Sequence, residues 1–216
     1  MIDRLYPPSY FTGNDYGSDP RRDSMYHQER DRIYGYKRSG HILDVGCGVG
    51  SFLECFDDRW DKWAIEPASY AAEEARRRGE RLVEPDSIED DCGFWDVIVF
   101  RGTIQHVPRP FEYLEKARGW LADNGLLVLL ATPNTNSPYY RRFKTLPPLD
   151  PPRNFLLPSD LMLVNALENI GFAIQDVVYP YLETPYAHPV RDHLRWLTGK
   201  QPFAFWRSMM EIYAIK

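Results

Sequence analysis

The stretch HILDVGCGVGSFLE, residues 41–54, holds the pattern that decides the fold of this chain. An apolar run ends at Asp44, and Gly46, Gly48 and Gly50 follow before a second apolar segment begins. Glycine allows backbone conformations, and a close approach to a ligand, that a side chain would prevent. A strand, a glycine turn and a helix amino terminus together form a place where backbone N–H groups can hold a polar ligand. We therefore expect a buried first strand with a ligand site at its carboxyl end.

Apolar runs and amphipathic segments alternate along the rest of the chain, as is typical of a parallel sheet covered by helices. The expected strands cover residues 41–45, 60–66, 94–100, 126–133, 172–179 and 208–216. The expected helices cover 24–37, 69–79, 110–121 (with Phe111, Leu114 and Leu121 inward), a segment ending at Gly171, 190–197, and a segment after the glycines that buries Phe52, Leu53 and Phe56. The fold class is therefore α/β.

Length, charge and cysteine content limit the domain count and the partners. With 216 residues and a formal net charge of -5, the chain fits one domain and offers no basic footprint for nucleic acid or an anionic membrane. Cys47, Cys55 and Cys92 lack metal-ligand spacing, and we find no signal segment and no membrane-spanning apolar stretch. We expect a cytoplasmic monomer or homodimer that binds a small molecule, with no metal, membrane or nucleic-acid partner.

Glu66 is the acidic residue expected at the end of the second strand, 20 positions after Gly46. A carboxylate at this place can accept hydrogen bonds from both hydroxyls of a ribose, which favours a nucleoside-type ligand. The dinucleotide fingerprint G-x-G-x-x-G would require glycine at position 51, where this chain has Ser51. An NAD-dependent oxidoreductase is therefore the less favoured alternative.

The segment Asp44-Val-Gly-Cys-Gly-Val-Gly50 resembles the first motif of the class I S-adenosylmethionine-dependent methyltransferases. The resemblance covers about residues 40–180 and includes DVIVFRGTIQHV (96–107), GWLADNGLLVLLATPN (119–134) and LMLVNALENIGFAIQDV (161–177). It implies a Rossmann-like seven-stranded sheet of order 3-2-1-4-5-7-6, with strand 7 antiparallel and helices on both faces. It also implies S-adenosylmethionine as the cofactor, bound over the carboxyl ends of the first two strands.

The resemblance further implies which residues hold the cofactor. The glycines would line its methionine part, Asp44 would orient the loop, and Glu66 would bind the ribose hydroxyls. The adenine contacts would come from the segment around residues 86–88. The full set of expected cofactor-binding residues is Tyr16, Asp44, Gly46, Cys47, Gly48, Gly50, Glu66, Pro67, Asp86, Ser87, Ile88, Arg101 and Gly102.

His106 follows the expected fourth strand, beside the place implied for the methyl group. If the acceptor is a hydroxyl, its proton needs a base, and an imidazole has a suitable pKa near neutral pH. In related methyltransferases the histidine of this turn often shapes the cofactor pocket instead, and that alternative stays open. Two neighbours depart from the family pattern: Gln105 stands where Glu is common, and Arg101 could bind an acidic acceptor or form a structural ion pair.

Acceptor recognition is expected where the family pattern ends. The chain would be a single methyltransferase domain, divided into an aromatic amino-terminal lid or helix (1–39), a cofactor-binding core (40–133), an acceptor loop (134–157) and a carboxy-terminal part (158–216) with an insertion at 180–207. The amino-terminal part contains Tyr6, Tyr10, Phe11, Tyr16, Tyr26, Tyr34 and Tyr36, which either cover the ligand or pack on the sheet. The expected substrate-binding residues are His106, Asn134, Tyr139, Tyr140, Arg141 and Arg142.

The function implied is methyl transfer to a small molecule, with a hydroxyl oxygen on a sugar-like, phosphorylated or phenolic acceptor as the favoured target. The chain is similar in this respect to the quinone-ring O-methyltransferases and to methyltransferases that act on glycans. The alternative from another class is an inactive module that binds S-adenosylmethionine or S-adenosylhomocysteine and serves as a partner or sensor.

Overall fold

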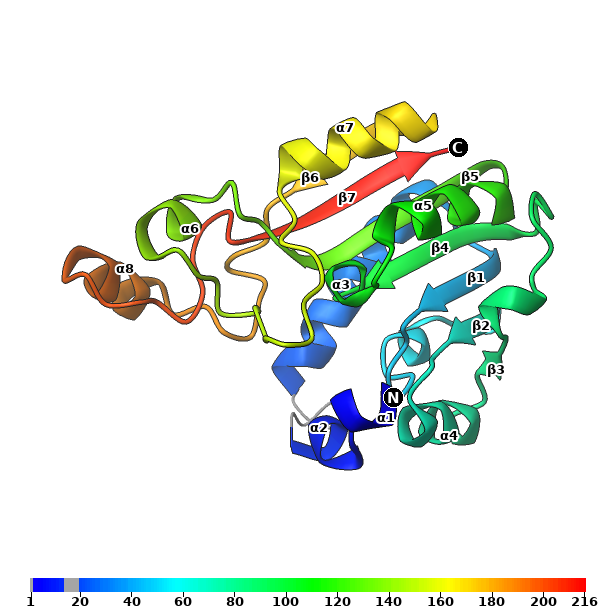
Figure 1. Cartoon of the computed structure of the whole chain (residues 1–216), viewed down its shortest axis with the longest axis horizontal. Helices are drawn as coiled ribbons and strands as arrows, with labels where there is room; N and C mark the ends of the chain where they lie inside the picture. The colour runs from blue at the N-terminus through cyan, green and yellow to red at the C-terminus, as the bar shows by residue number, and fades with distance from the viewer. Residues whose placement is uncertain (1, 14–19) are drawn as a thin grey trace.

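The computed structural model describes residues 2–13 and 20–216 and centres on one seven-stranded sheet (Figure 1). Its strand order is β3-β2-β1-β4-β5-β7-β6. The strands are β1 (Gly40–Val45), β2 (Trp60–Ile65), β3 (Arg81–Leu82), β4 (Trp95–Arg101), β5 (Leu121–Pro133), β6 (Ala173–Val178) and β7 (Met209–Ile215). Strands β1 to β5 pair in parallel, and β7 is antiparallel to both β5 and β6. The predicted order and the antiparallel seventh strand are confirmed.

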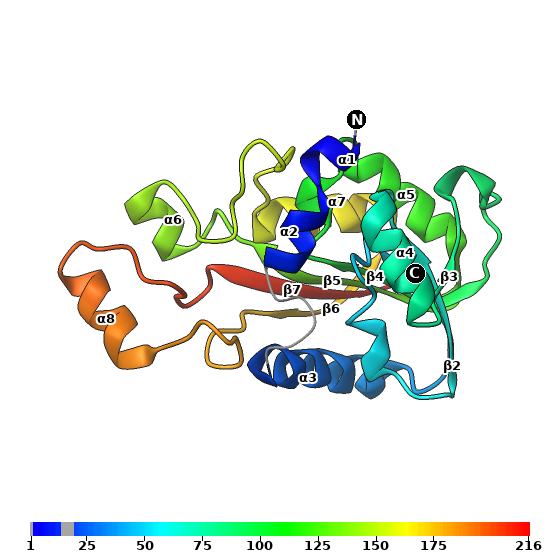
Figure 2. The ribbon, with the colours of Figure 1, turned by 90° about the horizontal axis from the view of Figure 1, so that it is seen from below.

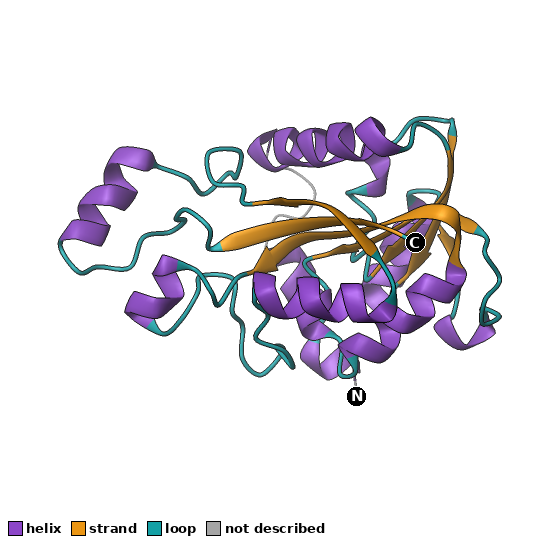
Figure 3. Ribbon diagram, turned by 90° about the horizontal axis from the view of Figure 1, so that it is seen from above, coloured by secondary structure: helices purple, strands orange, loops and turns teal. Residues whose placement is uncertain are grey.

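Helices cover both faces of the sheet. Helix α3 (Pro20–Tyr36) lies on one face, and α5 (Pro110–Trp120) and α7 (Asp160–Ile170) lie on the other (Figure 2). The remaining helices are α1 (Ile2–Leu5), α2 (Pro8–Gly13), α4 (Ser69–Arg77), α6 (Pro138–Phe143) and α8 (Pro189–Leu197), with 3₁₀ turns η1 (Leu53–Cys55), η2 (Pro85–Ser87) and η3 (Ile104–His106). Helices α6 and α8 project from the body beyond the carboxyl end of β5 (Figure 3).

The core has two layers because successive side chains of a strand point to opposite faces of the sheet. On the α5 and α7 side, Leu43 and Ile98 pack with helix residues such as Leu114. On the α3 side, the neighbouring strand residues Ile42 and Val97 pack against that helix. Both layers are apolar along the central strands, which explains why these runs show no polar alternation.

The expected helix after the glycines is wrong. Only the 3₁₀ turn η1 forms there before β2 begins at Trp60, because a single tight turn is enough to direct the apolar residues of this segment into the core. The apolar residues of this segment still reach the core: Phe52, Leu53 and Phe56 are all buried.

Three smaller differences concern helix ends and faces. Phe111 was expected to face inward but is 38% exposed, while Leu114 on the next turn is fully buried. Helix α3 begins at Pro20 rather than near residue 24, since proline suits the first turn of a helix. The proline-rich segment 134–157 contains helix α6, which starts after the capping residue Ser137. In the described ranges, no helix is long and apolar enough to cross a lipid bilayer.

Candidate active site

The glycine loop leaves the carboxyl end of β1 and is tied to β2. The Gly46 amide donates to the carbonyl oxygen of Ile65 at 2.7 Å. Gly46 has φ of 77°, and a Cβ atom at this position would overlap the side chain of Thr103. Gly48 has φ of 58°, in the left-handed region that favours glycine. The loop therefore has glycines, without side chains, where it passes the end of β4.

Glu66 joins the glycine loop to the residues that follow β2. Its Oε2 accepts a hydrogen bond from the Gly48 amide at 2.9 Å, and its Oε1 accepts one from the Ala68 amide at 2.8 Å. Burial raises the pKa of Glu66, and these two amides oppose that shift. A carboxylate offers about four acceptor sites, so both oxygens can accept further hydrogen bonds from ligand hydroxyls.

Asp44 lies beneath the glycine loop and is 1% exposed. Its Oδ1 has no hydrogen-bond partner among the described residues. Burial raises the pKa of Asp44 to about 8, and the positive charge of Arg101 only partly offsets that effect. A buried carboxylate oxygen without a donor is costly, so this atom is a ready partner for a cationic N–H group of a ligand.

Arg101 ends β4 and binds helix α3 rather than standing free. Its Nε donates to Glu29 Oε2 at 2.7 Å, and its Nη2 donates to Glu29 Oε1 at 3.3 Å. The guanidinium carbon lies 4.3 Å from the centre of the Tyr26 ring. Burial alone would lower the pKa of Arg101, but attraction to Glu29 outweighs it and the pKa is raised. The fork of this arginine is therefore already occupied by a buried ion pair.

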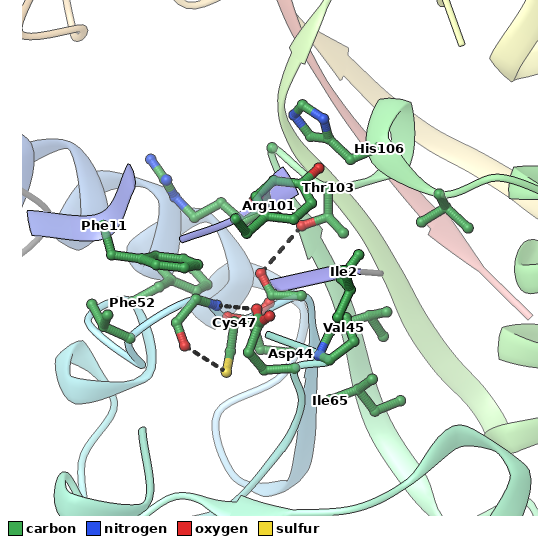
Figure 4. Close-up of a pocket in the computed structure, with 18 of the residues that line it drawn as sticks. Ile2, Phe11, Asp44, Val45, Cys47, Phe52, Ile65, Arg101, Thr103 and His106 are labelled. Atoms are coloured by element: carbon green, nitrogen blue, oxygen red, sulfur yellow. Dashed lines mark hydrogen bonds between the residues drawn. The ribbon is translucent and has the colours of Figure 1, made fainter. Parts of the chain in front are cut away.

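These residues surround a cavity of about 260 Å³ at the carboxyl edge of the sheet. Figure 4 shows Asp44, Cys47 and Thr103 grouped around the glycine loop, with Phe11 beside it and His106 on the side of η3. The residues expected to bind the cofactor that line this cavity are Asp44, Gly46, Cys47, Gly48, Glu66, Pro67, Arg101 and Gly102. Tyr16, also expected there, lies outside the described residues.

Gly50 belongs to the motif but does not line the cavity. A Cβ atom there would lie 3.3 Å from the Cα of Ala75 and 3.2 Å from the Cγ of Glu80. Because Gly50 has no side chain, the loop can pack closely against α4 at this position.

The residues expected to contact adenine do not line the cavity. Asp86 is almost fully exposed and lies 3.8 Å from the Lys116 ammonium group. Ser87 and Ile88 also do not line the cavity, whereas Glu84 and Pro85 do. The polar segment after β3 has no apolar periodicity to fix its register in a sequence comparison.

His106 ends the turn η3 and lines the same cavity. Its Nδ1 lies 2.9 Å from the carbonyl oxygen of Arg153. A carbonyl only accepts hydrogen bonds, so we infer that Nδ1 carries the proton and that Nε2 of the neutral ring is an acceptor. Burial lowers the pKa of His106, which keeps the ring neutral at physiological pH.

Hydrogen bonds with two other parts of the chain hold helices α1 and α2 over the cavity. Asp3 accepts hydrogen bonds from the Ser69 amide at 2.8 Å and the Ser69 hydroxyl at 3.1 Å. Arg153 donates from Nε to the carbonyl oxygen of Leu5 at 2.6 Å, and its guanidinium carbon lies 4.8 Å from the centre of the Tyr10 ring. The backbone carbonyl of Arg153 holds His106, so one residue contacts both the covering helices and the histidine.

The aromatic residues of the amino-terminal part divide between the two expected roles. Tyr6, Tyr10 and Phe11 line the cavity. In contrast, the Tyr34 ring stacks on Trp60 at a centroid distance of 6.1 Å and the Tyr36 ring stacks on Tyr213 at 5.6 Å. Tyr26 takes part in both, since it lines the cavity and packs in the core.

The expected acceptor residues of segment 134–157 do not line this cavity. Asn134 is fully buried, and its side-chain amide donates to Asp160 at 3.2 Å. The remaining residues, Tyr139, Tyr140, Arg141 and Arg142, belong to α6. This helix packs on α8 in a small separate core, called the side core below, formed by Tyr139, Tyr140, Phe143, Leu146, Leu149, Trp196 and Phe205. The aromatic residues of α6 therefore pack in the side core, and Arg142 lies over Trp196 of α8.

Sequence reasoning missed several cavity residues. Thr103 donates a hydrogen bond to the Gly46 carbonyl at 3.3 Å. Glu29, which holds Arg101 from helix α3, was also missed, although it does not line the cavity. The full set of cavity residues not singled out as site residues above is Ile2, Val45, Val49, Ser51, Phe52, Ile65, Glu84, Pro85, Thr103, Val107, Pro108 and Tyr113. One feature of the sequence could have identified Thr103, because the position beside Gly46 requires a small residue.

Comparisons with known proteins agree with this geometry. A family model described as a methyltransferase domain matches residues 21–177, more than half of the chain. The chain is 27% identical to trans-aconitate 2-methyltransferase of Rhodopseudomonas palustris (strain BisB5), over 45% of this chain and 40% of that protein. It is 25% identical to trans-aconitate 2-methyltransferase of Mycobacterium sp. (strain KMS), over 73% and 67% of the two chains. The chain thus spans about two fifths of the first of these relatives.

A solved structure has the same fold. An S-adenosylmethionine-dependent methyltransferase from Archaeoglobus fulgidus aligns with a TM-score of 0.65 and 18% identity, covering 96% of this chain and 99% of that one. The residues present also fit the cofactor: the unpartnered Asp44 Oδ1 suits its ammonium group, and Glu66 suits its ribose. The NAD-dependent alternative has no support in the family match. The chain belongs to the methyltransferase domain family, as a class I member with S-adenosylmethionine as its cofactor.

Proposed function

We propose that this chain transfers a methyl group from S-adenosylmethionine to a hydroxyl oxygen of a small molecule. The observation that carries this proposal is His106, whose Nδ1 is bound by the Arg153 carbonyl while the ring lines the cofactor cavity. The neutral ring then has Nε2 available to accept a hydroxyl proton. Carboxylate acceptors are already ionised near neutral pH and need no such base.

In this mechanism the residues of the chain bind and orient the cofactor and the acceptor, and His106 accepts a proton. The cofactor, when bound, supplies a methyl group activated by a sulfonium. Glu66 would accept hydrogen bonds from the ribose of the cofactor and Asp44 would accept them from its ammonium group, and these bonds would fix the position of the cofactor. Residues of helices α1 and α2 cover one side of the cavity and so limit the access of water to it. His106 takes the proton from the acceptor hydroxyl as the oxygen attacks.

The lining favours a flat, uncharged acceptor, such as a phenol, over a phosphorylated one. Tyr6, Tyr10 and Tyr113 present aromatic surface to the cavity. Of the described residues that line it, Arg101 is the sole arginine or lysine, and Glu29 already occupies its guanidinium. Trans-aconitate, the compound in the relatives' names, is a tricarboxylate and would need cations that this lining does not offer.

The test is an assay of the purified chain with S-adenosylmethionine and a panel of phenols, sugars, sugar phosphates and trans-aconitate. Products are identified by mass spectrometry. We expect O-methylation of a phenol, and a fall in kcat of about a hundredfold or more in His106→Gln. His188→Gln, a change of an exposed histidine at the start of α8, is the control.

Three results would contradict parts of the proposal. Methylation of trans-aconitate alone would assign a carboxylate acceptor. An unchanged kcat in His106→Gln would mean that the histidine shapes the cofactor pocket and does not transfer a proton. Binding of S-adenosylhomocysteine without methylation of any panel compound would favour the inactive binding module.

A further inference from the structure

The insertion at residues 180–207, called the arm below, carries an unusual share of exposed apolar side chains. Thirteen large hydrophobic residues are exposed in the described part of the chain, and seven of them lie in the arm. These seven are Leu182, Tyr186, Val190, Leu194, Leu197, Phe203 and Trp206. Concentration of exposed apolar side chains in one segment indicates a surface that binds something.

Helix α8 presents three of these residues on one side. Val190, Leu194 and Leu197 are spaced as neighbours on one helix face and are 77%, 59% and 76% exposed. The inner side of the helix is already packed, because Trp196 stacks on Phe205 at a centroid distance of 4.2 Å. Asp192 caps this inner side by accepting a hydrogen bond from the His188 amide at 2.8 Å. The outer apolar face is therefore not needed to hold α8 in place.

The charges beside this face are positive. Arg191 and Arg195 lie with their guanidinium carbons 4.5 and 4.9 Å from the centre of the exposed Phe203 ring, and Lys200 follows the helix. Between residues 184 and 206 the sole acidic residue is Asp192, which is fully buried. The exposed charges of this stretch are thus all cationic, on a chain with a formal net charge of -5.

We propose that the outer face of α8, together with Phe203, binds the surface of a membrane that contains anionic lipids. A short helix with leucines on one side and arginines beside them has the pattern of helices that lie in the interface plane. The arm projects from the body, so a flat surface can meet it without meeting the sheet first (Figures 1 and 3).

Charge argues for this occupant over a second copy of the chain. A symmetric contact through α8 would place Arg191 and Arg195 of one copy against the same residues of the other, which like charges oppose. An anionic lipid surface complements these cations and accepts the leucines. The net charge of the whole chain gives no sign of this, because it averages the acidic body with the basic arm.

The test measures co-sedimentation of the full chain with vesicles of phosphatidylcholine alone and with added phosphatidylglycerol. We expect binding to the anionic vesicles that weakens at high salt, and little binding to the neutral ones. The double variant Leu194→Asp, Leu197→Asp should bind the anionic vesicles roughly tenfold or more weakly, since it removes apolar contact and adds negative charge. Leu161→Asp is the matched control, because Leu161 is 64% exposed but lies on α7.

A second variant, Arg191→Glu, tests the charges while the apolar face stays intact, and it should also weaken binding. Circular dichroism and S-adenosylhomocysteine binding check that each variant is folded. Absence of binding to the anionic vesicles, or equal binding by the double variant and the unmodified chain, would overturn the proposal. So would a dimer that the double variant converts to a monomer in sedimentation velocity without any vesicle binding, because a second copy would then occupy this face.

Discussion

The amino-terminal segment and the side core are built from the same kinds of side chain, but these side chains have different surroundings. In the first, Tyr6 and Tyr10 line the cavity and Arg153 binds the Leu5 carbonyl above it. In the second, Arg142 lies 4.8 Å from the Trp196 ring and aromatic rings contact one another. Tyrosines and arginines therefore do not identify a binding site by type; the element that packs opposite them decides their role.

The largest expected difference comes from two glycines, Gly46 beside the cavity and Gly199 in the arm next to the side core. Gly46→Ala places a Cβ in a left-handed conformation and against Thr103, at a combined cost of about 2–5 kcal/mol. We expect a lower free energy of unfolding and at least about tenfold weaker S-adenosylhomocysteine binding by calorimetry.

Gly199→Ala is the matched change in the arm. Gly199 has φ of 75°, but the nearest atom to an added Cβ is the Arg142 Nη2 at 4.0 Å. This variant should lose about 1–2 kcal/mol of stability in urea unfolding and keep its ligand affinity. Equal affinities in the two variants would show that the glycine loop is not the ligand site.

The second expected effect is a pH dependence of ligand affinity that arises from Asp44. Its pKa of about 8 means that the carboxyl group is protonated at neutral pH in the ligand-free protein and must release the proton to pair with an ammonium group. Affinity for S-adenosylhomocysteine should rise by up to about tenfold per pH unit below pH 8 and level off above it. Asp44→Asn should bind weakly with no such slope; an unchanged slope would assign the titration to another group.

Protonation of Asp44 also affects the free energy of unfolding, and here the trend with pH is opposite to that of ligand affinity. The ordinary pKa of 3.8 applies to the unfolded chain, so between about pH 4 and pH 8 the folded protein holds a proton that the unfolded chain releases. This group therefore makes the ligand-free protein less stable as pH rises through that window, and Asp44→Asn should remove the contribution in urea unfolding measured across it.

The sequence was sufficient for the parts of the site that depend on local backbone chemistry. The glycines, Asp44 and Glu66 lie within one strand, turn and strand, so their spacing carries the information. The sheet order came from the resemblance to a family, which local patterns alone do not provide. The helix expected after the glycines was wrong because the burial of Phe52 and Phe56 suits a 3₁₀ turn as well as a helix.

Contacts between segments that lie far apart in the sequence could not be predicted from local spacing. Arg101 and Glu29 are 72 residues apart, and the bond between Arg153 and Leu5 joins residues 148 positions apart. Each side chain had several chemically suitable partners in the sequence, and tertiary packing selects among them. The assignment of Arg142 to the acceptor rested on residue type and on its place in the loop where the family pattern ends, and the packing of α8 on α6 could not be anticipated.

Arg153 provides the third expected effect. Arg153→Met removes the hydrogen bond to Leu5 and the contact with Tyr10 and keeps an unbranched side chain. A hydrogen bond from a charged group contributes about 1.5–3 kcal/mol, so we expect roughly tenfold weaker ligand binding by calorimetry. The variant should also lose protection of the α1 and α2 amides in hydrogen exchange. Full protection with unchanged affinity would mean that Asp3 alone holds these helices in place.

Arg142→Met is the corresponding change in the side core and the smallest expected effect. The arginine lies over Trp196 and near Phe143, and a contact of this kind contributes about 0.5–1 kcal/mol. We expect that loss in urea unfolding, with no change in ligand affinity and none in the KM of the acceptor, because α6 does not line the cavity. A large rise in acceptor KM would instead return Arg142 to the substrate-binding role suggested by its sequence context. In that case the similarity between the two regions would extend from composition to function.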